Sequence, residues 1–327
     1  MTGRLLAASL AALFAIEGAS AQDATGRFYS LKGDLVSPAY EGWYPNENGT
    51  ITLSFGYFNS NWEQEFDVPV GPDNYFTMVD AGQLDDLQEE GLVADQADQG
   101  QPTHFYPRRN PFLFTLTVPA DFGDKEWVWT LKTQGRTNRA FGVVTPDYRI
   151  DPQVMSTEVG GNFGDLDNRL RDNLAPVLEV EGELRRSVRV GEAVTLSTFA
   201  DDPDDYPPRT TRDRTPTNLD QLYNPNSAGS VVVAGAPGLR LSWFVYRGPA
   251  EHVTFSPTQL KSWMDSRVYA NSPWSFPYVL PEIPADNRWR TQVTFREPGE
   301  YVLRAVASDG SQFTYENVSV SVAPLAR

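Results

Sequence analysis

The segment Ile51-Thr-Leu-Ser-Phe-Gly-Tyr57 alternates large apolar side chains with small or polar ones. Successive side chains of a β-strand point to opposite faces, so this period of two predicts a strand with one apolar face. The same alternation recurs along the chain, in runs that are rich in Val, Thr and aromatic residues and bounded by Gly, Pro, Asn or Asp, as is typical of strands. These runs lie at 112–118, 127–131, 194–198, 239–243 and 301–305.

Helical periodicity is nearly absent, and only residues 83–93 fit a short amphipathic helix. Several short strands without alternating helices favour sandwiches of antiparallel sheets over a parallel α/β sheet. The length of 327 residues is enough for about two domains. The predicted fold class is therefore all-β, with two antiparallel β-sandwich domains after a signal peptide.

The composition excludes several classes of function. The chain has 27 Lys+Arg against 43 Asp+Glu, a net charge of −16, and no Cys. Disulfides, thiolate nucleophiles and Cys-ligated zinc are excluded by the lack of Cys. Nucleic acid is not an expected partner, because binding to phosphates depends on an excess of Lys and Arg. A hydrophobic content of 40% predicts a folded chain.

Residues 1–21 have the pattern of a secretory signal peptide. Arg4 gives a positive charge, residues 5–16 are apolar, and Ala19-Ser-Ala21 fits the small-x-small cleavage rule. The apolar run is shorter than the roughly 20 residues of a membrane-spanning helix, and no later run reaches that length. We expect an exported protein, periplasmic or extracellular, without a transmembrane span. An exported chain without Cys favours a bacterial source.

The polar, Gly-rich segment Gly160-Gly-Asn-Phe-Gly-Asp-Leu-Asp marks the expected domain boundary. It is followed by Asn173-Leu-Ala-Pro, which looks like the entry to a new first strand. We therefore predict an N-terminal β-sandwich at 22–155, a linker at 156–172 and a C-terminal β-sandwich at 173–327.

The second half carries a series of short motifs in a fixed order. They are Ala175-Pro-Val, Val190-Gly-Glu-Ala-Val-Thr-Leu, Ala200-Asp-Asp-Pro-Asp-Asp, Leu241-Ser-Trp, Pro298-Gly-Glu-Tyr and Ala307-Ser-Asp-Gly. In this order the segment 173–324 resembles a bacterial PKD-like or cadherin-like immunoglobulin-type module. It lacks the Trp-Asp-Phe-Gly-Asp-Gly signature of PKD domains. The resemblance implies an immunoglobulin-like sandwich with Trp243 between its sheets, and a role as a spacer or as a binding domain for protein or carbohydrate.

Residues 101–110 form a basic and aromatic segment within the acidic first half of the chain. Arg108 and Arg109 fit a clamp for a carboxylate or a sulfated sugar, with Tyr106 as a platform and His104 beside it. A hydrolase site between the domains would use the same residues. The alternative is that the two arginines pair with the neighbouring acidic loop.

Aromatic side chains also gather between 256 and 290 without strand alternation. Aromatic rings on loops stack against sugar rings or anchor a protein partner. The candidate ligand-binding residues are Trp263, Tyr269, Trp274 and Tyr278. The alternative is that these rings form a small additional core over one end of the sandwich.

No cofactor is expected from the sequence, and calcium is the one ion for which it offers candidate ligands. Asp201, Asp202, Asp204 and Asp205 gather at one turn, and carboxylates are the ligands that calcium prefers. The alternative is a turn of solvated acids without a cofactor. His and Cys spacings typical of zinc sites are absent.

These observations predict a secreted, non-catalytic binding, adhesion or structural protein built from two β-sandwich modules. Its expected partner is a protein or polysaccharide surface. Carbohydrate binding through Trp263 and Trp274 is one alternative, and a hydrolase with a site between the domains is another.

Overall fold

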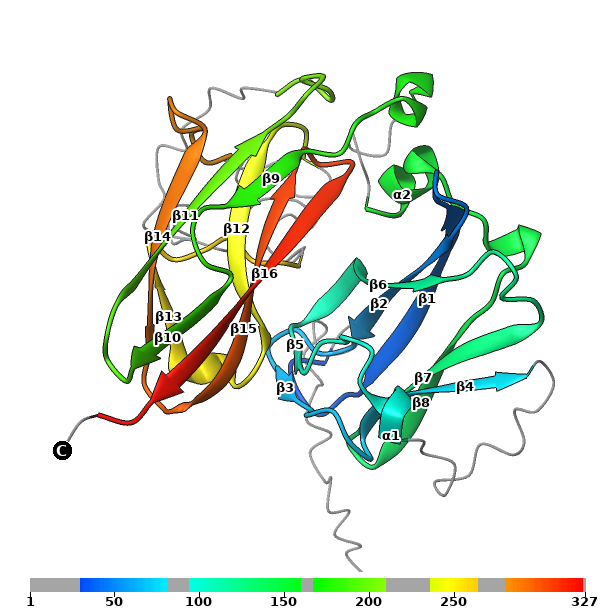
Figure 1. Cartoon of the computed structure of the whole chain (residues 1–327), viewed down its shortest axis with the longest axis horizontal. Coiled ribbons are helices and arrows are strands. Elements are labelled where there is room, and N and C mark those ends of the chain that lie inside the picture. Colours follow the sequence, from blue (N-terminus) through cyan, green and yellow to red (C-terminus); the bar gives the residue numbers. More distant parts are fainter. Residues whose placement is uncertain (1–29, 81–93, 160–166, 210–235, 264–279, 326–327) are drawn as a thin grey trace, which may run out of the picture.

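The computed structural model describes residues 30–80, 94–159, 167–209, 236–263 and 280–325. In these ranges the chain consists mainly of strands, which confirms the all-β prediction. The strands gather in two groups (Figure 1), which we call the N-terminal unit (residues 30–159) and the C-terminal unit (167–325). The predicted signal peptide and the helix expected at 83–93 lie outside the described residues. The predicted domain boundaries stay a prediction.

The N-terminal unit contains two three-stranded sheets, β1-β2-β6 and β4-β7-β8, and the short pair β3-β5, all antiparallel. Its elements are β1 (Val36–Pro45), β2 (Ile51–Asn59), β3 (Phe66–Asp67), β4 (Asn74–Asp80), α1 (Ala94–Ala97), β5 (His104–Phe105), β6 (Arg108–Val118), β7 (Lys125–Thr133), β8 (Arg136–Gly142), η4 (Pro146–Tyr148) and α2 (Pro152–Glu158). Aromatic rings dominate the core between the larger sheets. Phe55 and Trp129 both pack against Phe76, with ring centroids 5.3 and 5.6 Å away.

Strand β2 is buried on both faces, although the alternation of its residues predicts one buried face and one exposed face. Thr52 and Ser54 are as inaccessible as their apolar neighbours. Thr52 Oγ1 donates to Asn46 Oδ1 at 3.1 Å, so its hydroxyl stays hydrogen-bonded inside. At Gly56 a Cβ atom would lie 2.5 Å from the carbonyl oxygen of Asn110, which requires glycine there. The apolar alternation therefore identifies the strand but not its burial.

The C-terminal unit is a sandwich of two four-stranded sheets, β13-β14-β11-β9 and β10-β16-β15-β12. Its elements are η6 (Asn168–Arg171), β9 (Val177–Val180), β10 (Arg185–Arg189), β11 (Val194–Asp201), β12 (Arg240–Arg247), η7 (Ala250–His252), β13 (Val253–Ser256), β14 (Arg288–Phe295), β15 (Gly299–Ser308) and β16 (Phe313–Ala323). If β10 is left out, the strands of the first sheet correspond in order to strands D, E, B and A of an immunoglobulin domain, and those of the second sheet to strands G, F and C. This is the strand order of a constant-type immunoglobulin domain. Strand β10 pairs with β16 in parallel, an exception to the predicted antiparallel sheets.

Two side chains support the immunoglobulin-like assignment. Trp243 on β12 is 1% exposed and lies in the core between the sheets, as the resemblance implied. Tyr301, at the start of β15, donates its hydroxyl to the carbonyl oxygen of Glu297 at 3.1 Å. A tyrosine bonded to the backbone a few residues upstream at this corner is a hallmark of immunoglobulin-type sandwiches. The narrower PKD-like or cadherin-like resemblance stays a prediction.

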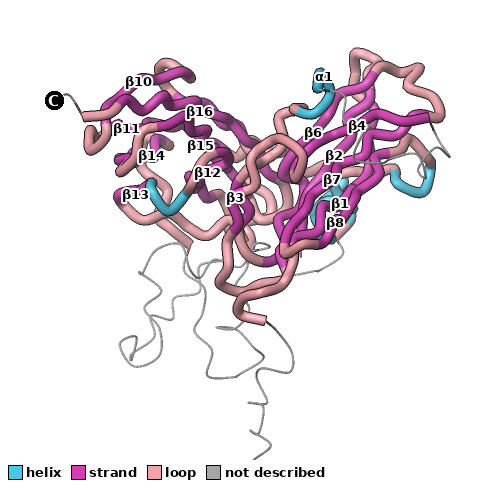
Figure 2. Tube along the Cα trace, turned by 90° about the horizontal axis from the view of Figure 1, so that it is seen from below, coloured by secondary structure: helices cyan, strands magenta, loops and turns pink. Residues whose placement is uncertain are grey.

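The two units pack against each other along β12, β15 and β16 (Figures 1 and 2). Phe244 and Tyr246 of β12 belong to the same apolar cluster as the N-terminal core. The segment before β6 bonds to β12: the Thr103 amide donates to the Tyr246 carbonyl at 3.1 Å, and the Val245 amide donates to Tyr106 Oη at 3.0 Å. We call this contact between the units the junction.

Arg304 on β15 is a buried cation at the centre of the junction. Its guanidinium lies 3.4 Å from the ring centroid of Tyr246 and 5.3 Å from that of Tyr315. It donates to Asn317 Oδ1 within its own unit and to the Leu113 carbonyl of the other unit. A buried charge is costly unless it is hydrogen-bonded, so these contacts tie the units together through one side chain. Among the described residues no helix has the length and apolarity to cross a membrane.

Candidate binding site at the junction of the two units

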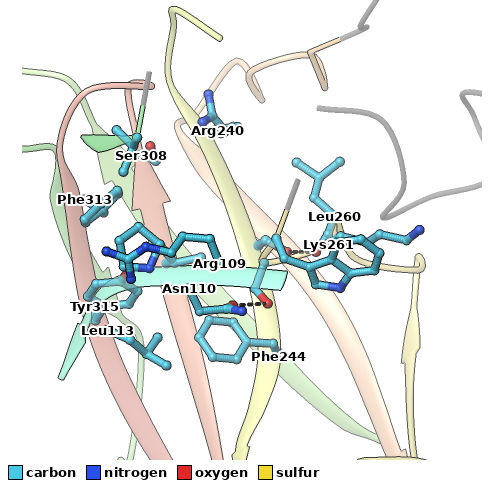
Figure 3. A pocket seen from close by; sticks show the side chains of 16 residues that line it. Arg109, Asn110, Leu113, Arg240, Phe244, Leu260, Lys261, Ser308, Phe313 and Tyr315 are labelled. Atoms are coloured by element: carbon cyan, nitrogen blue, oxygen red, sulfur yellow. Dashed lines mark hydrogen bonds between the residues drawn. The ribbon is translucent and has the colours of Figure 1, made fainter. Parts of the chain in front are cut away.

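A cavity of about 100 Å³ lies at the junction (Figure 3). Residues of β6, β12, β15 and β16 form most of its wall, which combines aromatic and aliphatic side chains with three cations and several small polar side chains. Among the described residues, none that lines it is acidic. The apolar lining residues are Pro111, Leu113, Val159, Phe244, Leu260, Trp263, Val306, Phe313 and Tyr315. The polar and basic lining residues are Arg109, Asn110, Arg240, Ser242, Lys261, Ser262 and Ser308.

Arg109, a predicted clamp residue, reaches the cavity with its charge already paired. Its two terminal nitrogens donate to the two carboxylate oxygens of Glu41, at 2.6 and 2.5 Å. Burial raises the pKa of Glu41 while Arg109 opposes the rise. A second carboxylate, that of Glu158, lies 3.9 Å from Arg109. The bidentate pair holds Arg109 in place at the cavity wall.

The structure places Arg108 away from Arg109 and outside the cavity lining. Its backbone is left-handed, with φ of 58°. Its guanidinium lies over the rings of Phe58 and Trp62, 4.7 and 4.2 Å from their centroids, and donates to the Ser60 carbonyl. The two adjacent arginines therefore do not converge on one ligand.

His104 and Tyr106 lie on the N-terminal side of the junction, with His104 3% exposed. Its Nδ1 lies 2.8 Å from Asp67 Oδ1 and its Nε2 lies 3.0 Å from Glu65 Oε2. Burial lowers the pKa of His104, but hydrogen bonds and charges from the two carboxylates outweigh it and raise the pKa overall. Both ring nitrogens thus lie within hydrogen-bond distance of a carboxylate. The phenol oxygen of Tyr106 accepts a hydrogen bond from the Val245 amide.

Trp263 is the one predicted loop aromatic that the described residues include. It is buried in the cavity wall, and Lys261 Nζ lies 4.6 Å from its ring centroid. Ser262 Oγ donates to Asn110 Oδ1 at 3.3 Å, which fixes this segment to β6 (Figure 3). The structure thus brings Trp263 and Arg109, predicted as members of separate sites, into one cavity. Tyr269, Trp274 and Tyr278 lie outside the described residues.

The four predicted calcium ligands do not form one group at the end of β11, although Asp202 and Asp204 lie close together. Asp201 accepts from Asn287 Nδ2 at 2.9 Å, and Asp205 is exposed with φ of 49°. Asp204 accepts from the Leu174 amide at 3.2 Å. Three or more His, Cys, Asp or Glu side chains grouped to hold a metal ion do not occur in the part of the chain that the structure describes.

Asp202 lies near two acids, and one of them is distant in sequence. Burial, helped by Asp204 and Asp309, raises the pKa of Asp202 to about 7. Asn173 Nδ2 donates to Asp309 Oδ2 at 2.9 Å, while Asn173 Oδ1 and Asp202 Oδ1 are buried without a hydrogen-bond partner. The sequence prediction missed Asn173 and Asp309 as site residues, although both belong to motifs that it quoted.

The sequence gives no signal for most of the cavity wall. Asn110, Arg240, Ser308 and Phe313 come from four strands. Arg240, Ser308 and Phe313 are neighbours across β12, β15 and β16, and the packing of the two units brings Asn110 to them.

No protein-family model matches the chain, and no curated protein matches its sequence. Among solved structures it is similar to surface layer protein SbsC, domains 1–6, with 10% identity and a TM-score of 0.23, over 90% of this chain and 28% of that one. It is similar to titin domains Z1Z2 in complex with telethonin, with 10% identity and a TM-score of 0.22, over 89% of this chain and 98% of that one. It is similar to the Yersinia pseudotuberculosis adhesin InvE, with 12% identity and a TM-score of 0.22, over 89% of this chain and 59% of that one. The immunoglobulin-like assignment of the C-terminal unit rests on its strand order and on the positions of Trp243 and Tyr301.

Proposed function

We propose that this chain is an exported, non-catalytic binding protein that holds an anionic ligand with an apolar face in the junction cavity. The signal-peptide pattern of residues 1–21 supports export to the periplasm or the cell exterior. The cavity is the observation that carries the proposal, because the described part of its wall combines aromatic rings with three cationic side chains.

The charge balance of the cavity favours an anion. Glu41 pairs with Arg109, Asp309 acts on Arg240, and Lys261 brings a third cationic side chain to the wall. Ligand pockets are usually apolar with a few polar groups that fix orientation, and this cavity has that character. In a chain of net charge −16, such a site is an electrostatic exception.

The two histidines support binding rather than catalysis. His104 has a carboxylate on each ring nitrogen. His252 Nε2 lies 3.3 Å from Glu297 and 3.5 Å from Glu251. A general base needs a ring nitrogen within hydrogen-bond reach of the substrate proton, and neither histidine lines the cavity.

Thermal-shift measurements on the full chain test this proposal. A panel of small cyclic anions and their neutral analogues serves as the probe. We expect anions to raise Tm more than their analogues, because a ligand that binds only the folded state stabilises it. Lys261→Gln should reduce the shift, and Lys125→Gln, an exposed lysine on β7 outside the cavity, should not. Equal shifts in both variants would contradict the site.

A second proposal concerns calcium. We propose that a calcium ion binds between Asp202 and Asn173, because each has a buried oxygen without a partner. Calcium accepts carboxylate, amide, backbone and water oxygens together, so two or three protein side chains suffice. This site lies where the chain enters the C-terminal unit, and an ion there would stiffen that entry.

Adding calcium after chelation tests the ion site. We expect millimolar calcium to raise Tm of the full chain and Asp202→Asn to abolish the rise. Asp205→Asn is the matched control, because Asp205 is exposed. A Tm that is identical in calcium and in chelator would refute the ion.

A further inference from the structure

We infer that Asn48 is a site of self-modification, at which the chain converts the asparagine to aspartate and isoaspartate without an enzyme. The site is the turn between β1 and β2, and the inference is independent of the function proposed above. Three observations carry it: the order Asn48-Gly49, the exposure of both residues, and two hydrogen bonds that hold the Asn48 carboxamide.

The sequence supplies the attacking group. Asn48 is the only asparagine of the chain that is followed by glycine. The nitrogen of a glycine is the least hindered backbone nucleophile, because glycine has no Cβ. Gly49 has φ of 81°, and no atom beyond its chain neighbours lies within 4 Å of the position that a Cβ would take. Attack of this nitrogen on the neighbouring carboxamide carbon is intramolecular and closes a five-membered ring, so it needs no partner molecule.

The fold of the turn holds the carboxamide of Asn48 against the backbone that follows it. The Thr50 amide donates to Asn48 Oδ1 at 3.0 Å, and the Thr50 hydroxyl donates to the same oxygen at 2.7 Å. The first bond is an Asx-turn, in which an asparagine side chain bonds the backbone two residues on. It folds the side chain back along the Asn48–Gly49 peptide and so brings the carboxamide carbon toward the Gly49 nitrogen.

Two donors on one amide oxygen also activate the carbon beside it. When the Gly49 nitrogen adds to that carbon, negative charge develops on Asn48 Oδ1, and donors already in place stabilise it. Thr50 is itself held by Asn46: its hydroxyl accepts from Asn46 Nδ2 at 2.8 Å, and its carbonyl accepts from the Asn46 amide at 2.8 Å. The donors are therefore fixed before the reaction begins.

One hydrogen bond opposes the reaction. The Gly49 amide donates to the Asn46 carbonyl at 3.0 Å, and it must leave that acceptor before its nitrogen attacks. Asn48 and Gly49 are exposed, and an exposed turn opens locally at little cost. This bond therefore slows the reaction without blocking it.

The reaction balances with water as its only co-reactant. A hydroxide ion takes the Gly49 amide proton, the nitrogen bonds to Cγ of Asn48, and the bond from Cγ to Nδ2 breaks. Nδ2 takes a proton from water and leaves as ammonia, so a succinimide ring remains. Water then adds to one of the two ring carbonyls: addition at Cγ gives aspartate, and addition at the backbone carbonyl gives isoaspartate. Either product adds a negative charge beside Glu47.

Peptide mapping of the full chain during incubation in mildly alkaline, isotopically labelled water tests the inference. We expect Asn48 to convert before any other asparagine, to give both products, and to take up labelled oxygen. Thr50→Val should slow the conversion about fivefold, as expected for the loss of one hydrogen bond to the reacting oxygen. Thr50→Ser keeps a hydroxyl and should react at the wild-type rate. Thr52→Val is the matched control, because the hydrogen bonds of the Thr52 hydroxyl join it to Asn46.

The outcomes separate the site from the role of the turn. If Asn48 does not convert, or if another asparagine converts first, the site is overturned. If Asn48 gives aspartate alone, without isoaspartate, the succinimide route is overturned. If Thr50→Val converts at least as fast as the wild type, or if Thr52→Val slows the conversion equally, the activation by the Thr50 hydroxyl is overturned.

Discussion

Each unit of the chain buries one tryptophan almost completely, but the two indoles have different surroundings. Trp129 in the N-terminal unit lies among Phe55, Phe76 and Phe114, and its Nε1 donates to Asn74 Oδ1 at 2.9 Å. Trp243 in the C-terminal unit lies among Val, Leu and Ala side chains, and its Nε1 has no hydrogen-bond partner in the described structure. The first core is thus specified by ring contacts and polar bonds, and the second by the alternation of its strands.

The largest expected effect is at Trp243. Trp243→Ala removes a side chain that fills the space between two sheets and leaves a cavity that aliphatic neighbours do not close. We expect the free energy of unfolding to fall by about 3–5 kcal/mol, measured by urea denaturation. A loss below about 1 kcal/mol would show that this core does not depend on the tryptophan.

A smaller effect is expected where the two units meet. Arg304→Leu leaves the Leu113 carbonyl without its donor and removes the guanidinium from the rings of Tyr246 and Tyr315. We expect a loss of about 3 kcal/mol and the appearance of two thermal transitions in place of one. Arg290→Leu is the control, because Arg290 is an exposed arginine of β14 outside the junction. A single transition in Arg304→Leu would show that other contacts suffice to couple the units.

Replacement of each indole by a smaller ring sharpens the comparison directly. Trp129→Phe leaves the buried Asn74 Oδ1 without a donor, whereas Trp243→Phe removes an indole nitrogen that has no partner. We expect Trp129→Phe to cost about 2 kcal/mol more than Trp243→Phe, as measured by urea denaturation. Equal costs would mean that the polar bond does not distinguish the two cores.

The smallest effect is a dependence on pH at the N-terminal side of the junction. The pKa of His104 is raised in the folded chain by Asp67 and Glu65. Its stabilisation is therefore complete below the ordinary histidine pKa of about 6.5 and is lost as the pH rises through the raised value. We expect the urea midpoint to fall over that window in the wild type and less in His104→Gln. His252→Gln should keep the wild-type slope, and an identical slope in His104→Gln would contradict the charge pairing.

The same contrast explains what the sequence predicts and what it does not. In the C-terminal unit β11 and β14 each have one buried face, so alternation and turn residues predict strand, face and class, whereas β12 is buried on both faces because the junction covers its second face. In the N-terminal unit β2 is buried on both sides, and β3 and β5 have two residues each, too few to show a period. The alternation of apolar and polar residues therefore predicts the strands of the N-terminal unit but not how they pack.

The candidate site was predictable only in part, for a related reason. Arg109 and Trp263 are conspicuous by residue type, but they are separated by more than a hundred positions and meet only through the packing of two units. Glu41, which neutralises Arg109, is one acid among many in an acidic chain. Asn173 and Asp309 likewise meet through sheet topology, which spacing does not contain.

The central claim is that the two units form one body whose junction holds the cavity. Scanning calorimetry of the full chain tests this claim most directly. The account predicts one cooperative transition whose calorimetric and van't Hoff enthalpies agree. Two separate transitions in the wild-type chain, each with its own midpoint, would contradict it.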